Sequence, residues 1–194
     1  MEKERYRSNG LVQISALCPI TRLSLCWVVL GLLACGCTIK HDYQWREYKI
    51  APDRVSAPST LGRGSAVSII NAQPNAESKM LGYIGGHQYY GSLNQLTDAV
   101  VTQLSQELGS RNVKVSDNAP KTLKVAVLNT KYTLGSWMLR VEMDLRVEAE
   151  DGYARTINVS NRSPGTVDGG FNGAVALGVI EILNDPKVIA YLMN

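Results

Sequence analysis

The stretch that decides the fold is Leu139-Arg140-Val141-Glu142-Met143-Asp144-Leu145-Arg146-Val147-Glu148-Ala149-Glu150, in which apolar and polar residues alternate without interruption. A β-strand points successive side chains to opposite faces, so strict alternation predicts a strand with one buried and one solvated face. Antiparallel sheets commonly have one such open face. We therefore expect residues 139–149 to form a half-buried strand of an antiparallel sheet.

The segments on either side extend this strand into a meander. Thr122–Tyr132 precedes it and Tyr153–Ser160 follows it, and both are rich in β-branched residues. The connections are Leu134-Gly135-Ser136 on one side and Asp151-Gly152 on the other, and Asp-Gly is a strong signal for a two-residue hairpin turn. Three consecutive antiparallel strands follow from this pattern.

Two further regions have the period of a helix. Leu93–Leu108 repeats apolar residues at steps of three and four, with Ser92 as the expected N-cap and Gly109 just after the end. Ala174–Leu183 is almost wholly apolar and is expected to lie buried against the sheet. Pro186 suits the first turn of a last helix that runs to Leu192.

The remaining segments complete the expected fold class. Ser65–Ile70 is a short strand candidate and Arg111–Val115 is a brief extended piece. Residues 71–92 are polar and glycine-rich, and residues 82–91 within them are expected to form a flexible, aromatic surface loop. Residues 65–194 are therefore expected to be one α+β domain, in which a mainly antiparallel sheet ends in a three-strand meander. The helices are expected to pack on one face of this sheet.

The amino-terminal region has the features of a signal peptide. A basic segment that ends at Arg22 precedes the apolar run Leu23–Ala34, whose 12 residues are too few to cross a bilayer easily. All four cysteines of the chain lie within the first 37 residues, so the body carries no disulfide framework. Residues 1–34 are therefore expected to be removed on export, and the long basic segment also leaves room for a start downstream of Met1.

The end of the leader resembles a bacterial lipobox. In Leu32-Leu33-Ala34-Cys35 a leucine stands at −3 and a small residue at −1 before a cysteine. The resemblance implies lipid attachment at Cys35 with palmitate-type acyl chains, and Gly36 in place of an aspartate implies delivery to the outer membrane. Attachment at Cys37 and an uncleaved membrane anchor are the alternatives.

Residues 35–64 are expected to be the lipidated amino terminus and a flexible tether. The turn-rich run Ala51–Thr60 contains two prolines and little apolar patterning. Tyr43, Trp45 and Tyr48 precede this run, and we expect them to pack on the body rather than to lie at the membrane interface.

Taken in chain order, these features resemble the YajG-type bacterial lipoproteins. The resemblance implies a protein of the outer membrane that faces the periplasm, with an α+β fold and no assigned activity. The matching segments are Leu32–Cys35, Val67–Ile69, Leu93–Leu108, Gly109–Val113, Leu123–Val127, Leu139–Ala149 and Gly169–Asn172.

The residue types in the body do not suggest an enzyme. His41 and His87 are the only histidines of the chain, and no cysteine follows Cys37, so we expect no catalytic residue, no metal site and no cofactor. The glycines of residues 82–91 fit neither of the common phosphate-binding patterns. The net charge of +3 comes mostly from the leader, which leaves a nearly neutral body and argues against nucleic acid as a partner.

Two surfaces remain as candidates for binding. The glycine-rich stretch 82–91 carries Tyr83, His87, Tyr89 and Tyr90, and aromatic residues of this kind are enriched where proteins meet. The charged face of residues 139–149 mixes carboxylates with arginines, which indicates a solvated surface that could also contact a partner. We name the first of these as the expected partner-binding loop.

These observations predict a non-enzymatic lipoprotein, anchored in the outer membrane by its acyl chains and facing the periplasm. Its expected role is to bind another envelope protein or to assist the assembly of an envelope complex. The alternatives are a carrier of a small apolar ligand, held between the sheet and Ala174–Leu183, and an envelope hydrolase.

Overall fold

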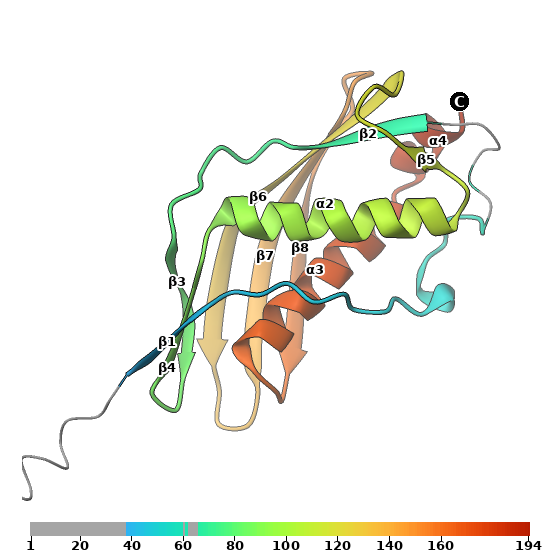
Figure 1. Cartoon of the computed structure of the whole chain (residues 1–194). Helices are drawn as coiled ribbons and strands as arrows, with labels where there is room; N and C mark the ends of the chain where they lie inside the picture. Colours follow the sequence, from blue (N-terminus) through green and yellow to red (C-terminus); the bar gives the residue numbers. More distant parts are fainter. Residues whose placement is uncertain (1–37, 60, 62–65) are drawn as a thin grey trace, which may run out of the picture. The chain divides into compact units, whose positions relative to one another are not determined.

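The computed structural model describes residues 38–59, 61 and 66–194 (Figure 1). The predicted signal peptide 1–34 and the cysteines at 35 and 37 lie outside these residues. Thr38–Asn194 forms one compact unit, which contains the entire described hydrophobic core. Within the described part of the chain, no helix has both the length and the apolar character that crossing a bilayer requires.

The main sheet has five strands in the order β5-β2-β6-β7-β8. Strands β6, β7 and β8 pair antiparallel and form the predicted meander, whereas β2 runs parallel to both β5 and β6. Helices and a largely antiparallel sheet together confirm the α+β class. The bounds are β2 Ala66–Asn71, β5 Lys114–Val115, β6 Lys121–Leu134, β7 Leu139–Ala149 and β8 Ala154–Ser163.

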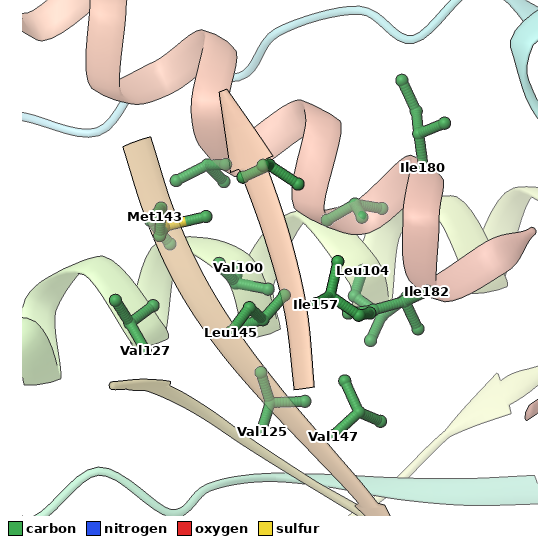
Figure 2. Packing of buried hydrophobic residues seen from close by; sticks show 14 of the residues in the cluster. Val100, Leu104, Val125, Val127, Met143, Leu145, Val147, Ile157, Ile180 and Ile182 are labelled. Atoms are coloured by element: carbon green, nitrogen blue, oxygen red, sulfur yellow. The ribbon is translucent and has the colours of Figure 1, made fainter. Parts of the chain in front are cut away.

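Strand β7 has the two faces that its alternation predicts. Its apolar residues, from Leu139 to Ala149, are at most 6% exposed, and its charged residues face solvent. The helices α2, Leu93–Ser110, and α3, Val167–Leu183, both pack on the apolar face, so the other face of the sheet is open. Figure 2 shows this core, with Val125, Val127, Met143, Leu145, Val147 and Ile157 from the sheet and Val100, Leu104, Ile180 and Ile182 from the helices.

Helix α2 begins where the sequence predicts and ends later. Ser92 and Gln95 form a capping box, in which each side chain accepts a hydrogen bond from the backbone N–H of the other residue. The prediction that Gly109 follows the helix is wrong, because the helix continues through Ser110. The left-handed residue after the helix is Asn112, with φ 64°, a conformation that asparagine tolerates well.

Helix α3 begins at Val167, seven residues before the predicted Ala174. Thr166 caps it by accepting a hydrogen bond from the Gly169 N–H. Glycines in its first turns allow the helix to touch the sheet, since a Cβ at Gly170 would lie 2.3 Å from Leu139 Cδ1. A Cβ at Gly173 would lie 2.2 Å from Asn161 Nδ2. The glycines whose low helix propensity led the sequence to predict a later start are therefore the residues that allow α3 to pack closely on the sheet.

Residues 38–59, which the sequence analysis assigned to a flexible tether, lie against the domain. Tyr43, Val55 and Ala57 are buried, and so is Leu61. The Tyr43 hydroxyl donates to Asn172 Oδ1 of α3 at 2.8 Å, whereas Tyr48 keeps about half of its surface exposed. The packed unit therefore begins at Thr38 rather than at residue 65.

The prediction of a flexible surface loop over residues 82–91 is wrong, because most of these residues lie in strands. They belong to the hairpin of β3, Lys79–Ile84, and β4, His87–Gly91, to which β1, Ile39–Asp42, adds a parallel strand. Gly85 and Gly86, with φ 56° and 84°, make the left-handed turn of this hairpin. We call this three-stranded sheet, in the order β1-β4-β3, the small sheet.

Candidate functional site

The small sheet holds all four residues of the predicted partner-binding loop and divides them into two pairs. His87 and Tyr89 share one face of β4, because side chains alternate along a strand. This inner face packs against the core through Tyr89 and Ile84. Tyr90 lies on the opposite, outer face of β4, and Tyr83 of β3 lies on the same outer face, directly beside Gln88. The predicted loop therefore has two faces, of which the inner one packs on the core and the outer one carries the exposed Tyr83.

The inner face joins β1 to β4 through its two histidines. His41 Nε2 and His87 Nδ1 are 2.7 Å apart, so one ring nitrogen donates a hydrogen bond and the other accepts it. The His41 ring also stacks on Tyr89, with 5.0 Å between the ring centroids. Within the described residues no three His, Cys, Asp or Glu side chains cluster to hold a metal ion. The hydrogen bond between the two histidines links β1 to β4.

A partly buried acidic residue of α3, Asp168, lies close to His41. Burial raises the pKa of Asp168, and the neighbouring His41 and Arg46 offset part of that rise. Its Oδ1 is buried and has no hydrogen-bond partner among the described residues. Burial also raises the pKa of Tyr43, and the charge of Asp168 adds to that effect. The Tyr43 hydroxyl is consequently held in its protonated form, in which it donates to Asn172.

The outer face of the small sheet presents apolar and aromatic side chains to solvent. Tyr83 is 55% exposed and Met80 48% exposed, and Tyr90 lies beside Met80 in the register. Lys40 places its Nζ 5.6 Å from the centre of the Tyr90 ring, within the range of a cation–π contact. We call Lys40, Met80, Tyr83 and Tyr90 the outer patch. Sequence analysis found the two tyrosines but missed Lys40 and Met80, since it did not predict strands here.

Tyr132 of β6 supports the outer patch from the side. Its hydroxyl donates to the Tyr83 carbonyl oxygen at 2.7 Å, and a Cβ at Gly82 would lie 3.0 Å from its ring. Tyr132 faces this way because β6 has an irregular register between Val127 and Asn129, after which Tyr132 lies opposite Val141. Burial and the neighbouring tyrosine hydroxyls raise the pKa of Tyr132. The hairpin is therefore fixed to the end of the main sheet.

The charged face of β7 is a solvated surface, as the sequence predicts. Arg146 pairs with Glu148, and Arg140 Nη1 lies 3.7 Å from Glu142 Oε1. Asn158 of β8 donates to Asp144 Oδ1 at 2.6 Å. Exposed ion pairs of this kind contribute only about 0–1 kcal/mol to stability. The carboxylates have arginine or amide partners, and this arrangement does not resemble an acid–base pair.

The turn between β6 and β7 exposes apolar side chains that sequence analysis passed over. Trp137 is 91% exposed, Met138 52% and Leu134 42%. The Gly135 N–H donates to the Met138 carbonyl oxygen at 2.9 Å, which closes the turn. The sequence signal was a tryptophan beside Gly135-Ser136, where a turn normally carries polar residues.

A cavity of about 420 Å³ lies between β8, α3 and the segment 48–54. Its lining includes the cationic side chains Lys49, Arg54 and Arg162, and no carboxylate. The residues that line this cavity come mainly from β8, α3 and the segment 48–54 and not from β7, on which α3 lies directly at Gly170. Side chains therefore fill the space between β7 and α3 at Gly170, whereas the cavity lies between α3 and the edge strand β8 of the same sheet.

Comparisons with known proteins give distant similarities in structure. No protein-family model and no curated protein matches the sequence. A Xanthomonas campestris protein of the DUF330 family aligns with 15% identity and a TM-score of 0.49, over 78% of this chain and 95% of its own. The PelC dodecamer of Paraburkholderia phytofirmans aligns with 15% identity and a TM-score of 0.37, over 72% of this chain and 96% of its own. A homologue of the neuraminyllactose-binding hemagglutinin from Helicobacter pylori aligns with 12% identity and a TM-score of 0.39, over 76% and 97%.

Proposed function

We propose that this protein is a lipid-anchored, non-enzymatic module of the bacterial cell envelope that binds another envelope protein through its outer patch. The observation that carries this proposal is the place of the lipobox in the chain. The cysteine of Leu32-Leu33-Ala34-Cys35 stands only four residues before Ile39, with which the small sheet begins. A lipid at Cys35 would hold the small sheet close to the membrane.

The proposed location is the periplasmic face of the outer membrane. In the lipobox pattern an aspartate after the cysteine favours retention in the inner membrane, and this chain has Gly36 there. Two or three acyl chains give stable anchoring, whereas a single chain binds a membrane only reversibly. The resemblance to YajG-type lipoproteins supports the same location.

The outer patch has the composition of a protein-binding surface. Tyrosine and methionine are enriched in the cores of interfaces, since they give large contact areas, and a tyrosine loses little side-chain entropy on binding. Tyr83 and Met80 are exposed on the same face, and Lys40 adds a cation at the edge strand β1. Because Tyr89 packs on the inner face, Tyr83 and Tyr90 are the tyrosines that a partner could reach.

Photocrosslinking in cells tests the partner-binding proposal. A photoreactive amino acid at position 83 should capture one envelope protein, and the same group at position 156, on the open face of β8, should not. Tyr83→Ala combined with Tyr90→Ala should then reduce capture from a photoreactive group at position 40, about tenfold for a loss of about 1.4 kcal/mol. The thermal melting temperature of this double variant serves as the control for folding.

Capture that is equal from positions 83 and 156 would contradict the proposal. So would a double variant that melts like the wild type and is captured equally well. A loss of capture together with a lowered melting temperature would assign Tyr83 and Tyr90 to packing instead of binding.

A further inference from the structure

The β6–β7 turn, residues 134–138, projects apolar side chains that the described structure leaves uncovered. Trp137 is 91% exposed, and Leu134 and Met138 lie on either side of it. Large apolar side chains grouped in this way usually mark a surface that meets a protein or a membrane. The hydrogen bond from Gly135 to Met138 keeps the turn closed, so Trp137 projects from a defined structure.

This turn lies at the end of the domain where the chain enters it. The Ile39 N–H donates to the Gly86 carbonyl oxygen at 3.0 Å, which places the start of β1 beside the β3–β4 turn. The same hairpin contacts the end of β6 through Tyr83 and Tyr132. Figure 1 shows β1, the β3–β4 turn and the β6–β7 turn together at the lower end of the domain.

The length of chain before β1 limits the distance between this end and the membrane. Cys35 precedes Ile39 by four residues, and four residues span at most about 14 Å when fully extended. If Cys35 carries the proposed lipid, the entrance of β1 is therefore within this distance of the lipid headgroups. The packing of residues 38–59 on the domain removes the long tether that would have allowed the domain to move away.

The strand ends beside the turn carry paired cations. Arg140 of β7 lies directly opposite Arg162 of β8, and on its other side it lies opposite Thr133 of β6. Like charges directly opposite one another destabilise a sheet. Glu142 lies 3.7 Å from Arg140, which is too long for a strong ion pair. Two guanidinium groups next to an exposed tryptophan suit the phosphates of a lipid surface, because arginine binds phosphate well.

We infer that the β6–β7 turn is a second membrane contact. Trp137, with Leu134 and Met138, enters the headgroup region of the bilayer, where tryptophan is favoured, and Arg140 and Arg162 bind lipid phosphates. The lipid and the turn together would fix the orientation of the domain and hold the outer patch beside the membrane. This inference rests on the proposed lipid at Cys35 and commits to a lipid surface as the partner of the turn.

Depth-dependent fluorescence quenching tests the inference without the natural lipid. Residues 38–194, which contain the whole described core, would carry an amino-terminal histidine tag and bind vesicles through a nickel-chelating lipid. The vesicles would contain phosphatidylethanolamine and phosphatidylglycerol with brominated acyl chains. Trp45→Phe leaves Trp137 as the single tryptophan. We expect its emission to shift to the blue and to lose about half of its intensity or more, since the ring lies at the level where tryptophan meets the acyl chains.

Matched variants separate insertion from mere proximity. Trp137→Phe leaves Trp45, which is partly buried in the domain, and its emission should not change. Arg140→Glu with Arg162→Glu should reduce the quenching of Trp137 at least about twofold, since both variants reverse a charge at the anionic surface. Arg146→Glu reverses a charge on the same face of β7, about 20 Å further from the turn, and should have no effect.

Unchanged Trp137 emission on vesicles that hold the tagged protein would overturn the inference. If Trp137 is quenched equally in the Arg140→Glu, Arg162→Glu double variant and in Arg146→Glu, the proposed binding of lipid phosphates by Arg140 and Arg162 would be overturned. If position 137 instead captured an envelope protein in cells while its emission on vesicles stayed unchanged, the turn would be a protein contact. Because the tag replaces the natural anchor, the results on vesicles do not depend on whether Cys35 is lipidated.

Discussion

Asp185 shows how a single side chain joins three elements of this fold. It is 2% exposed and caps α4, Pro186–Met193, by accepting hydrogen bonds from the Lys187 and Val188 N–H groups. Its other oxygen, Oδ2, accepts from Arg155 Nη1 and from the Tyr153 hydroxyl, each at 2.7 Å. The carboxylate therefore holds the last helix to β8 and to the β7–β8 turn.

Replacing this carboxylate should destabilise the domain. Asp185→Ala removes a helix cap and leaves a guanidinium and a hydroxyl without their partner, so we expect a loss of about 2–3 kcal/mol in the free energy of unfolding. Urea denaturation followed by circular dichroism measures this loss. Asp117→Ala, at an exposed turn residue, is the matched control and should change stability by no more than about 0.5 kcal/mol. Equal midpoints for the two variants would refute the role given to Asp185.

Because Asp185 titrates, the difference in the free energy of unfolding between the wild type and Asp185→Ala should depend on pH. Burial alone would raise the pKa of Asp185, but the hydrogen bonds from Arg155, Tyr153 and two backbone N–H groups outweigh it and hold the pKa below its usual value. A carboxyl with a lowered folded-state pKa stabilises the fold above the pKa of the unfolded chain, about 3.9, and loses this effect as the pH falls through the lower folded value. The difference in the free energy of unfolding between the wild type and Asp185→Ala should therefore be constant near neutral pH and become smaller below about pH 4. Urea denaturation at a series of pH values measures it.

At the scale of elements, the strands with the clearest alternation were the most predictable. Residues 139–149 match β7 residue for residue, because apolar and charged side chains differ strongly in the free energy of burial. Strand β4 reads His87-Gln88-Tyr89-Tyr90, in which each side chain has both polar and apolar parts, so no period of two is visible. Its parallel partner β1 lies far away in the sequence, and sequence pattern alone cannot reveal such a pairing.

Helix α3 shows a second reason why the sequence does not predict every element correctly. Gly169, Gly170 and Gly173 have low intrinsic helix propensity, which moved the predicted start to Ala174. Tertiary packing overrides this propensity, since a larger side chain at Gly170 or Gly173 would clash with Leu139 or Asn161. The local helix preference of these glycines gives no information on their contacts with the sheet, because the contacted residues lie elsewhere in the sequence.

The register of β7 can be tested directly at two neighbouring positions. Leu145 is fully buried, so Leu145→Asp places a charge without a partner in the core and should unfold the domain at neutral pH. Glu148 lies on the open face beside Arg146, and Glu148→Lys should change the free energy of unfolding by no more than about 1 kcal/mol. Circular dichroism and urea midpoints of residues 38–194 compare the two. Similar tolerance at both positions would show that the register is wrong.

At the scale of the whole molecule, the structure shortens the chain that separates the proposed lipid anchor at Cys35 from the packed domain. The sequence identified Tyr83 and Tyr90 of the outer patch but not Lys40 and Met80, and it predicted a tether of residues 35–64 and a loop of residues 82–91. It failed there because Val55, Ala57 and Leu61 are isolated apolar residues among turn formers, and their burial depends on surfaces supplied by distant elements. With the packed unit beginning at Thr38, only the residues just after the lipobox separate it from Cys35.

Three features consequently gather at one end of the domain. These are the entrance of β1, the outer patch on the small sheet, and the exposed β6–β7 turn with Trp137. A lipid anchor at Cys35 would explain why these three features share one end of the domain. It would hold this end near the membrane and bring the outer patch next to a partner at the membrane surface. The proposed binding module and the proposed membrane contact both depend on this anchor.

Mass spectrometry of the amino terminus, on protein purified from the membrane fraction of a bacterial host, tests the anchor most directly. We predict a chain that begins at Cys35 and carries acyl chains on its thiol and its amino group, and we expect Cys35→Ser to remain an unprocessed precursor. A mature chain that retains Met1, or one in which Cys35 is unmodified, would contradict the account.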